Sequence, residues 1–460
     1  YDGLDGTELA ISESQERMAC VVRAEDADKF LALADKENLM ATKVAVVTAD
    51  PRLVMHWRKK KIVDLSREFL NSNGAAKYIT VNVEAPEKVG CCGCGCEKSM
   101  KERFMDTMTS LNVASQKGLM ERFDCTIGSG TVLMPHGGKN QLTPSQVMAA
   151  KVSLEKGNTN TVSLMSWGFN PNLSEKSPYH GAMSAVIESV AKIVAAGGSR
   201  NKCWLSFQEY FEKVGNNPSK WGKPFSALLG GLKAQLELGV GAIGGKDSMS
   251  GNFEELHVPP TLISFAAAVT KLQNVVSNEF KAANHNVYLL LPEYDENGLP
   301  NFDSIRSVFD EMEALVKSGK LLSTYTLGMG GIAEAVCKMG FGNGIGFAFD
   351  HMPHGVMFKP VYGGFLFETA EPVETSAQIL GHTTEEYSIK VDGETICMCD
   401  IQNAWEEKLE PVYPRKSATP KLFIPTFNYE AKSVAKSGIK LAQPKVLIPV
   451  FPGTNCDYDT

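Results

Sequence analysis

The sequence predicts an α/β protein (α+β in its details) with several domains, and three observations support this. Strand-like and helix-like segments alternate along most of the chain. A chain of 460 residues with 43% hydrophobic content is long enough for two to four separate cores. Residues 11–22 can be aligned with residues 357–368, which indicates a duplicated domain pair with a period of about 345 residues.

The first predicted domain covers residues 1–85. Within it, residues 11–22, 43–48 and 52–66 are expected to form strands, and residues 26–39 a helix. A cysteine-rich connector, residues 86–96, follows. The start and the end of the chain both read as cut elements, so we expect the natural polypeptide to continue on both sides.

The second predicted domain covers residues 97–275. Its clearest helix is 178–196, because Ser177 is a good N-cap, Pro178 suits the first turn and Gly197-Gly198 can end it. A second helix, 224–238, places four apolar side chains on one face: Phe225, Leu228, Leu232 and Leu236. The run VPPTLISFAAAV suits a buried strand.

The third predicted domain, 285–405, is a further α/β unit. It has a helix at 302–318, a glycine turn at 328–336, a short helical stretch at 372–381 and a strand at 386–400. Residues 406–443 are expected to be a linker, and residues 444–460 the start of another domain.

Charge and composition exclude several classes of function. The net charge of −7 and a pI of about 5.8 give no electrostatic reason for binding nucleic acid or anionic membranes. No apolar run approaches the roughly 20 residues that cross a bilayer. We therefore predict a cytoplasmic protein. Its eleven cysteines are expected to be mostly reduced core residues.

The segment GGKDSMSG, 244–251, is the sharpest chemical signal. Two glycines expose backbone N–H groups, and Lys246, Asp247 and Ser248 add a cation, a carboxylate and a hydroxyl, a combination that suits phosphate. It is not a Walker A loop, because Val240 and Asp247 break that pattern. The alternative is an ordinary glycine turn.

Three other segments carry weaker signals. Glu13 and Gln15 in SESQER could bind a sugar-linked substrate, although dense polar residues on a strand usually form a solvated face. Glu188 could bind a metal ion, although a single helical carboxylate is usually solvated. A structural metal site normally uses two pairs of cysteines separated by a long loop, but the cysteines of CCGCGC are clustered together with no second pair. A flexible connector is therefore favoured over a metal site.

Four motifs together resemble one family. ISESQERM, the helix HGAMSAVIESVAKIVAAGG, GGKDSMS and the terminal KVLIPVFPGTNCD are similar to segments of the formylglycinamide ribonucleotide amidotransferases, also called phosphoribosylformylglycinamidine synthases. The resemblance covers most of residues 11–405 and the last sixteen. It implies an internally duplicated synthetase with aminoimidazole ribonucleotide synthetase-like N- and C-terminal domains. Residues 1–85 would then end the first half, and residues 444–460 would begin the glutaminase domain.

The resemblance also implies the chemistry. In this family ATP, with Mg²⁺, activates the formylglycinamide oxygen of formylglycinamide ribonucleotide, and ammonia from glutamine displaces the phosphate. By resemblance, Glu13, Ser14, Gln15 and Ser248 would contact this substrate. The implied ATP or phosphate site comprises Ser206, Gly244, Gly245, Lys246 and Asp247, with Lys246 where small forms of the enzyme have a magnesium-binding asparagine. The catalytic histidine lies in the missing first half, so we expect the chain to be inactive alone.

Departures from the family pattern give one further prediction. At an auxiliary magnesium–nucleotide site of some large forms, Glu188 matches one ligand, but Lys192 replaces an asparagine and Met329 an aspartate. We therefore expect that site to be empty or altered. Two alternatives stay open: a non-catalytic scaffold of the same fold, and an independent ATP-dependent enzyme of the aminoimidazole or selenophosphate synthetase group. The incomplete segment 1–85 counts against the second of these.

Overall fold

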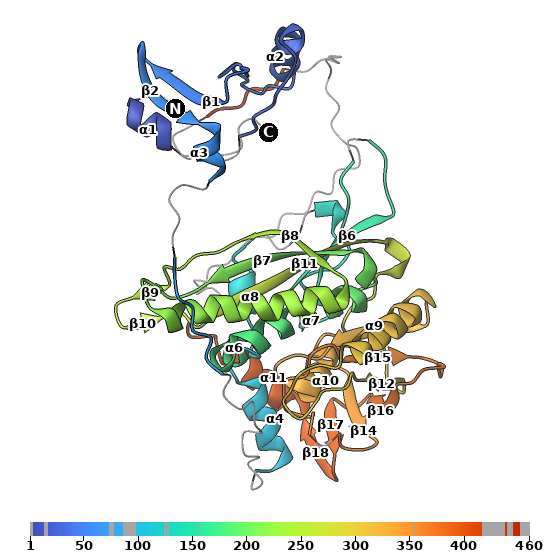
Figure 1. Cartoon of the computed structure of the whole chain (residues 1–460). Coiled ribbons are helices and arrows are strands. Elements are labelled where there is room, and N and C mark those ends of the chain that lie inside the picture. The colour runs from blue at the N-terminus through green and yellow to red at the C-terminus, as the bar shows by residue number, and fades with distance from the viewer. Residues whose placement is uncertain are drawn as a thin grey trace.

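The computed structural model places most of the chain in two sheet-and-helix units, with a smaller group of elements from residues 3–72 lying apart from them (Figure 1). The residues that the structure describes are 3–12, 17–72, 78–85, 98–123, 126, 128–154, 156–353, 355–415, 438 and 445–450. No helix among them is long and apolar enough to cross a membrane.

The first unit is built on a five-stranded sheet in the order β5-β6-β11-β7-β8. Strand β11 is antiparallel to both of its neighbours, and β7 is parallel to β8. The predicted buried strand is confirmed as β11, at the centre of the sheet. The strand bounds are β5 Met148–Lys151, β6 Thr161–Gly168, β7 Cys203–Tyr210, β8 Gly241–Lys246 and β11 Thr261–Lys271.

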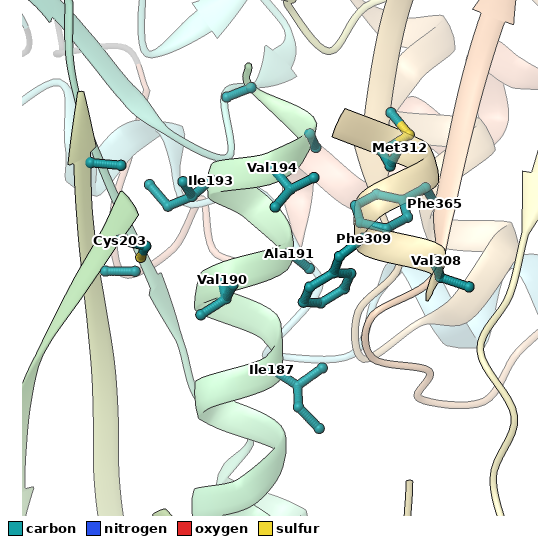
Figure 2. Packing of buried hydrophobic residues seen from close by; sticks show 14 of the residues in the cluster. Ile187, Val190, Ala191, Ile193, Val194, Cys203, Val308, Phe309, Met312 and Phe365 are labelled. Carbon is teal, nitrogen blue, oxygen red and sulfur yellow. The ribbon is translucent and has the colours of Figure 1, made fainter. Parts of the chain in front are cut away.

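Helix α7, Pro178–Ala195, confirms the helix predicted at 178–196. The Ser177 hydroxyl accepts a hydrogen bond from the His180 N–H, and Gly197 leaves the helix with φ +101°. The helix is apolar nearly all round because it is packed on two sides. Figure 2 shows Val190 and Ile193 on the side of Cys203 in β7, and Ile187 on the side of Phe309.

Helix α8, Pro218–Leu238, begins six residues before the predicted start, at an Asn217 cap with Pro218 in the first turn. It lies beside α7 (Figure 1). Its small residues face the sheet and α7: Ala227, Gly230, Gly231 and Ala234. The apolar face that the sequence predicted is present, but it is exposed to solvent.

The second unit is a seven-stranded sheet in the order β13-β15-β12-β16-β14-β17-β18. Helix α9, Phe302–Lys317, packs on α7, whereas α10, Gly331–Phe341, α4, Met100–Met108, and α11, Met398–Glu407, share a second core. The strand bounds are β12 Asn286–Leu290, β13 Leu321–Thr326, β14 Gly346–Phe349, β15 Phe365–Thr369, β16 Gln378–Thr384, β17 Ser388–Val391 and β18 Glu394–Cys397.

The remaining elements are short. They are α1 Gly6–Ile11, η1 Ala24–Asp26, α2 Ala27–Lys36, β1 Arg52–Trp57, β2 Lys60–Ser66, α3 Arg67–Asn71, α5 Lys117–Met120, η2 Gly128–Gly130, β3 His136–Gly137, β4 Thr143–Pro144, α6 Pro171–Lys176, η3 Arg200–Lys202, β9 Asn252–Phe253, β10 Leu256–His257 and η4 Leu272–Asn274.

Several predicted elements are wrong, and strand pairing explains most of the differences. Residues 43–48 form no strand, because no neighbouring strand pairs with them among the described residues. Residues 52–66 form a hairpin that turns at Arg58 and Lys59, both with positive φ. Described residues of 11–22 end α1 or have no regular structure.

In the second unit, residues 372–381 are not helical, since Gln378 begins β16, which pairs with β12 and β14. Residues 386–400 are a hairpin followed by the start of α11. The expectation of core cysteines holds for Cys203 and Cys337, but Cys20, Cys397 and Cys399 are exposed. Most of the predicted linker 406–443 lies outside the described residues, and α11 extends into its start.

Candidate functional site

The segment GGKDS lies at the carboxyl end of β8, the edge strand beside β7. Parallel strands bring their carboxyl ends to one edge of a sheet, which is where α/β folds usually bind ligands. Ser206 of β7 pairs with Gly244 of β8, and Gln208 pairs with Lys246. The structure thus brings Ser206 together with the glycine segment, although the two are far apart in the sequence.

The two glycines differ in their surroundings. A Cβ atom at Gly245 would collide with the Phe207 carbonyl oxygen, so close approach of β7 and β8 requires glycine there. At Gly244, a Cβ atom would meet no other atom within 4 Å. The structure therefore explains Gly245 by strand packing and leaves Gly244 open to solvent or to a ligand.

The next three residues present different groups at the end of the strand. Lys246 is exposed, and its Nζ donates to the Asp247 carbonyl oxygen over 3.3 Å. The Ser248 hydroxyl lies 2.9 Å from the Ser250 hydroxyl, and the Ser248 carbonyl accepts a hydrogen bond from the Phe211 N–H. This last bond ties the segment to the end of β7.

Glu209 of β7 was missed by the sequence analysis. It lies between Phe207 and Phe211 on the face of β7 that packs toward α7 and α8, and it is only 6% exposed. Burial, together with the negative charge of Asp247, raises the pKa of Glu209 to about 7. The signal was present in the sequence, because a glutamate interrupts the apolar positions of CWLSFQEYF that alternate at the strand period.

Glu188 lies elsewhere, on α7 where the two units meet. It is 6% exposed, so the expectation that it is solvated is wrong. Its Oε1 accepts from Lys192 Nζ over 2.8 Å, and its Oε2 accepts from the Phe169 N–H over 3.1 Å. Burial raises the pKa of Glu188, and the Lys192 charge opposes that shift. Because an ammonium group and a backbone N–H already engage both oxygens, these residues do not fit a magnesium ion.

A second buried ion pair faces Glu188 across Gly328. Glu334 Oε1 accepts from Lys338 Nζ over 2.6 Å, and Glu334 Oε2 accepts from the Gly330 N–H over 2.7 Å. A Cβ atom at Gly328 would lie 3.8 Å from Glu334 Oε2 and 4.0 Å from Glu188 Oε1. Each carboxylate is thus neutralised by a lysine four residues further along its own helix.

Two of the predicted segments cannot be placed in this geometry. The triplet Glu13, Ser14 and Gln15 lies outside the described residues, and so does the cysteine cluster of residues 91–96. Within the described part of the chain, no group of three or more histidine, cysteine, aspartate or glutamate side chains is arranged to hold a metal ion.

Comparisons with known proteins show what this chain is similar to. Residues 1–58 match the family model of the AIR synthase related protein, C-terminal domain. The phosphoribosylformylglycinamidine synthase subunit PurL of Thermoplasma acidophilum is 22% identical over 88% of this chain. That of Thermococcus sibiricus is 24% identical over 83% of it. The chain spans 57% and 55% of these two relatives.

Solved structures support the same fold. The structure of T. maritima PurL complexed with ATP superposes with a TM-score of 0.58, at 17% identity, over 83% of this chain and 56% of that one. PurL complexed with FGAR superposes with a TM-score of 0.57, at 18% identity, over 83% and 55%. Over most of its length, this chain is thus similar to the PurL subunits of phosphoribosylformylglycinamidine synthase, the family that the sequence motifs resemble, and its fold is AIR synthase-like.

Proposed function

We propose that this chain is part of the ATP-dependent synthetase that converts formylglycinamide ribonucleotide to formylglycinamidine ribonucleotide in purine biosynthesis, with glutamine as the source of ammonia. The observation that carries the proposal is the position of GGKDS at the carboxyl end of β8, beside Ser206 of β7, in a homologue of PurL. Backbone N–H groups and small side chains at such an edge suit the phosphates of a nucleotide or of a ribonucleotide substrate.

Individual roles follow from this arrangement. The exposed Gly244 allows a phosphate to approach the backbone, and Gly245, Lys246 and Ser206 complete the ATP side of the site. Ser248 offers its hydroxyl to the substrate, and Glu13, Ser14 and Gln15 would contact the substrate from the other synthetase half. Structures of PurL from T. maritima were solved with ATP and with FGAR, which supports both ligand classes for this chain.

The proposed protein works with partners. Residues 1–85 would complete the first synthetase half, residues 97–275 and 285–405 form the N- and C-terminal domains of the second, and residues 444–460 lead into a glutaminase. Ammonia transfer then requires the first half and the glutaminase. By this proposal, the chain alone does not turn over substrate.

Titration calorimetry tests the proposal. ATP and formylglycinamide ribonucleotide would be titrated into this chain and into a longer polypeptide that also carries a first synthetase half. We expect the longer protein to bind both ligands, and Ser248→Ala to weaken substrate binding about tenfold or more, consistent with loss of a hydrogen bond to the substrate.

Ser250→Ala is the matched control, because its hydroxyl is hydrogen-bonded to Ser248 but is given no ligand contact. It should change substrate binding less than Ser248→Ala does. A scaffold of the same fold would bind neither ligand even in the longer protein, and that result would refute the proposed function.

A further inference from the structure

Two exposed cysteines lie one residue apart where strand β18 passes into helix α11. Cys397 is the last residue of the strand and the N-cap of the helix, and Cys399 belongs to the first helical turn. Met398, between them, is fully buried, and so is Ile401. These apolar side chains anchor the start of the helix in the core, while both thiols stay exposed to solvent.

The turn from strand to helix keeps the two cysteines close together. Two extended residues span at most about 7 Å, and a disulfide needs a Cα separation of roughly 4.4–6.8 Å. At Cys397 the backbone is still extended, with φ −65° and ψ 122°, and Met398 begins the helix. The Cys399 thiol is the largest influence on the pKa of Cys397, which it lowers by hydrogen bonding. The pair therefore has a spacing that suits a bond between its sulfur atoms.

Positive and partly positive groups surround Cys397. The backbone N–H groups of Asp400 and Cys399, at the start of α11, also lower its pKa. Lys101, at the start of α4, lies close enough for its charge to interact with Cys397. Lys101 Nζ is 2.7 Å from Asp400 Oδ2, so the lysine also neutralises a nearby carboxylate that opposes the thiolate. Exposed thiols in electropositive surroundings of this kind are the reactive ones.

The other cysteines that the structure describes lack this combination. Cys203 and Cys337 are buried, and burial raises the pKa of both thiols, that of Cys203 to about 12. Cys20 is exposed, but no neighbouring cysteine accompanies it in the sequence. Within the described part of the chain, exposure and a second thiol nearby therefore occur together only at Cys397 and Cys399.

We propose that Cys397 and Cys399 form a thiol oxidation site, which a hydroperoxide converts to a disulfide. The Cys397 thiolate attacks one peroxide oxygen, the O–O bond breaks, and a sulfenic acid forms while the leaving oxygen takes up a proton as alcohol or water. The Cys399 thiol then attacks the sulfenic sulfur, and its proton leaves with the hydroxyl as water. The two thiols supply the two electrons that the peroxide accepts. A dithiol reductant restores both thiols by exchange.

Peptide mapping after peroxide treatment tests the proposal. Trypsin releases residues 391–408 as one peptide, which contains both cysteines and no other. We expect dilute hydrogen peroxide to remove the mass of two hydrogen atoms from this peptide, and dithiothreitol to restore it. In Cys399→Ser the disulfide cannot form, so Cys397 should instead be trapped as a sulfenic acid by dimedone, which does not label oxidised Met398.

Alkylation rates test the electropositive surroundings separately. Iodoacetamide at neutral pH should modify Cys397 about fivefold or more faster than Cys20, the exposed thiol without a partner cysteine. Lys101→Met should slow the reaction of Cys397 about twofold or more, because Asp400 then lacks its counter-charge. Lys98→Met is the matched control, since Lys98 pairs with Asp106 instead, and it should change the rate less.

Thermal unfolding of each variant shows whether it is folded. The proposal is overturned if Cys397 of the parent chain reacts no faster than Cys20. It is also overturned if peroxide adds oxygen to the peptide 391–408 of the parent chain without removing hydrogen. Neither readout involves ATP or formylglycinamide ribonucleotide, so the proposed function stands or falls separately.

Discussion

Gly244 and Gly245 are adjacent, yet the structure requires a glycine at only one of them. A side chain at 245 would collide with the Phe207 backbone, whereas the space at 244 is open. We predict that Gly245→Ala lowers the free energy of unfolding by about 2 kcal/mol or more, because backbone atoms cannot yield cheaply. Gly244→Ala should change it by less than about 0.5 kcal/mol.

Urea denaturation of both variants measures this difference. The two variants also distinguish an effect on stability from an effect on ligand binding, because a methyl group at 244 would obstruct a phosphate without disturbing the sheet. Equal stability of the two variants would contradict the close approach of β7 and β8 at Gly245.

His136, in β3, is a second residue whose environment predicts a measurable effect, in this case on the pH dependence of stability. Burial, reinforced by the charges of Lys117 and Lys338, lowers the pKa of His136 to about 4, whereas an unfolded histidine titrates near 6.5. The unfolded chain therefore binds more protons between these values, so this residue's contribution to stability is present above pH 6.5 and is lost as pH falls toward 4.

We predict that His136→Gln reduces the fall in the free energy of unfolding between pH 6.5 and 4 by on the order of 2 kcal/mol. Urea midpoints at pH 7, 5.5 and 4.5 measure the effect relative to the parent chain. If the urea midpoints of the parent chain and of the variant changed in parallel from pH 7 to 4.5, His136 would be accessible to protons in the folded state.

At the scale of elements, local signals predicted helices better than strands. Helices α7 and α9 begin at side-chain caps, Ser177 and Asn301, that can be recognised in the sequence, and both were predicted within one residue of their ends. Two predictions were wrong, a strand at residues 43–48 and a helix at residues 372–381. Both failed because strand formation depends on partners that lie far away in the sequence. The same limit applies to the candidate site.

The glycine segment could be found as a motif, but its neighbours could not. Ser206 beside Gly244, and Glu209 beside Asp247, depend on the parallel pairing of β7 with β8, which no local pattern specifies. The sequence did contain a signal for Glu209, because it is a charged residue at a strand position where the alternation predicts an inward apolar side chain. The partners of Glu188 were also missed, since only the packed helices bring Glu334 close to it.

Helix α8 shows how an apolar pattern can mislead about which face is buried. Its large residues, such as Leu232 at 49% exposed, face solvent, while Ala234 at 0% faces the sheet. We predict that Ala234→Leu destabilises the protein by about 1–3 kcal/mol through overpacking, and that Leu232→Gln changes stability by less than about 0.5 kcal/mol. Thermal and urea unfolding of the two variants would show the opposite order if the larger residues formed the packed face.

At the scale of the whole molecule, the ion pairs Glu188–Lys192 and Glu334–Lys338 lie where the five-stranded unit meets the seven-stranded unit. Lys192 also donates to the Trp167 carbonyl oxygen over 2.8 Å and lies over the Trp167 ring, so it ties α7 to the end of β6. Two lysines here supply the positive charge that a bound metal ion could otherwise provide. Folding of this junction should therefore be independent of divalent cations.

Lys192→Met tests this role, because it removes the charge and keeps most of the side-chain volume. With Glu188 left buried and unpaired, we predict a loss of about 3–5 kcal/mol at pH 7.5. The loss should be smaller at pH 5, where protonation can neutralise Glu188, whose pKa burial already raises. The double variant Glu188→Leu/Lys192→Met should recover much of the stability, since an apolar pair can replace a buried ion pair. If the single variant were as stable as the parent in urea, with or without added Mg²⁺, Lys192 would not be the group that neutralises this junction.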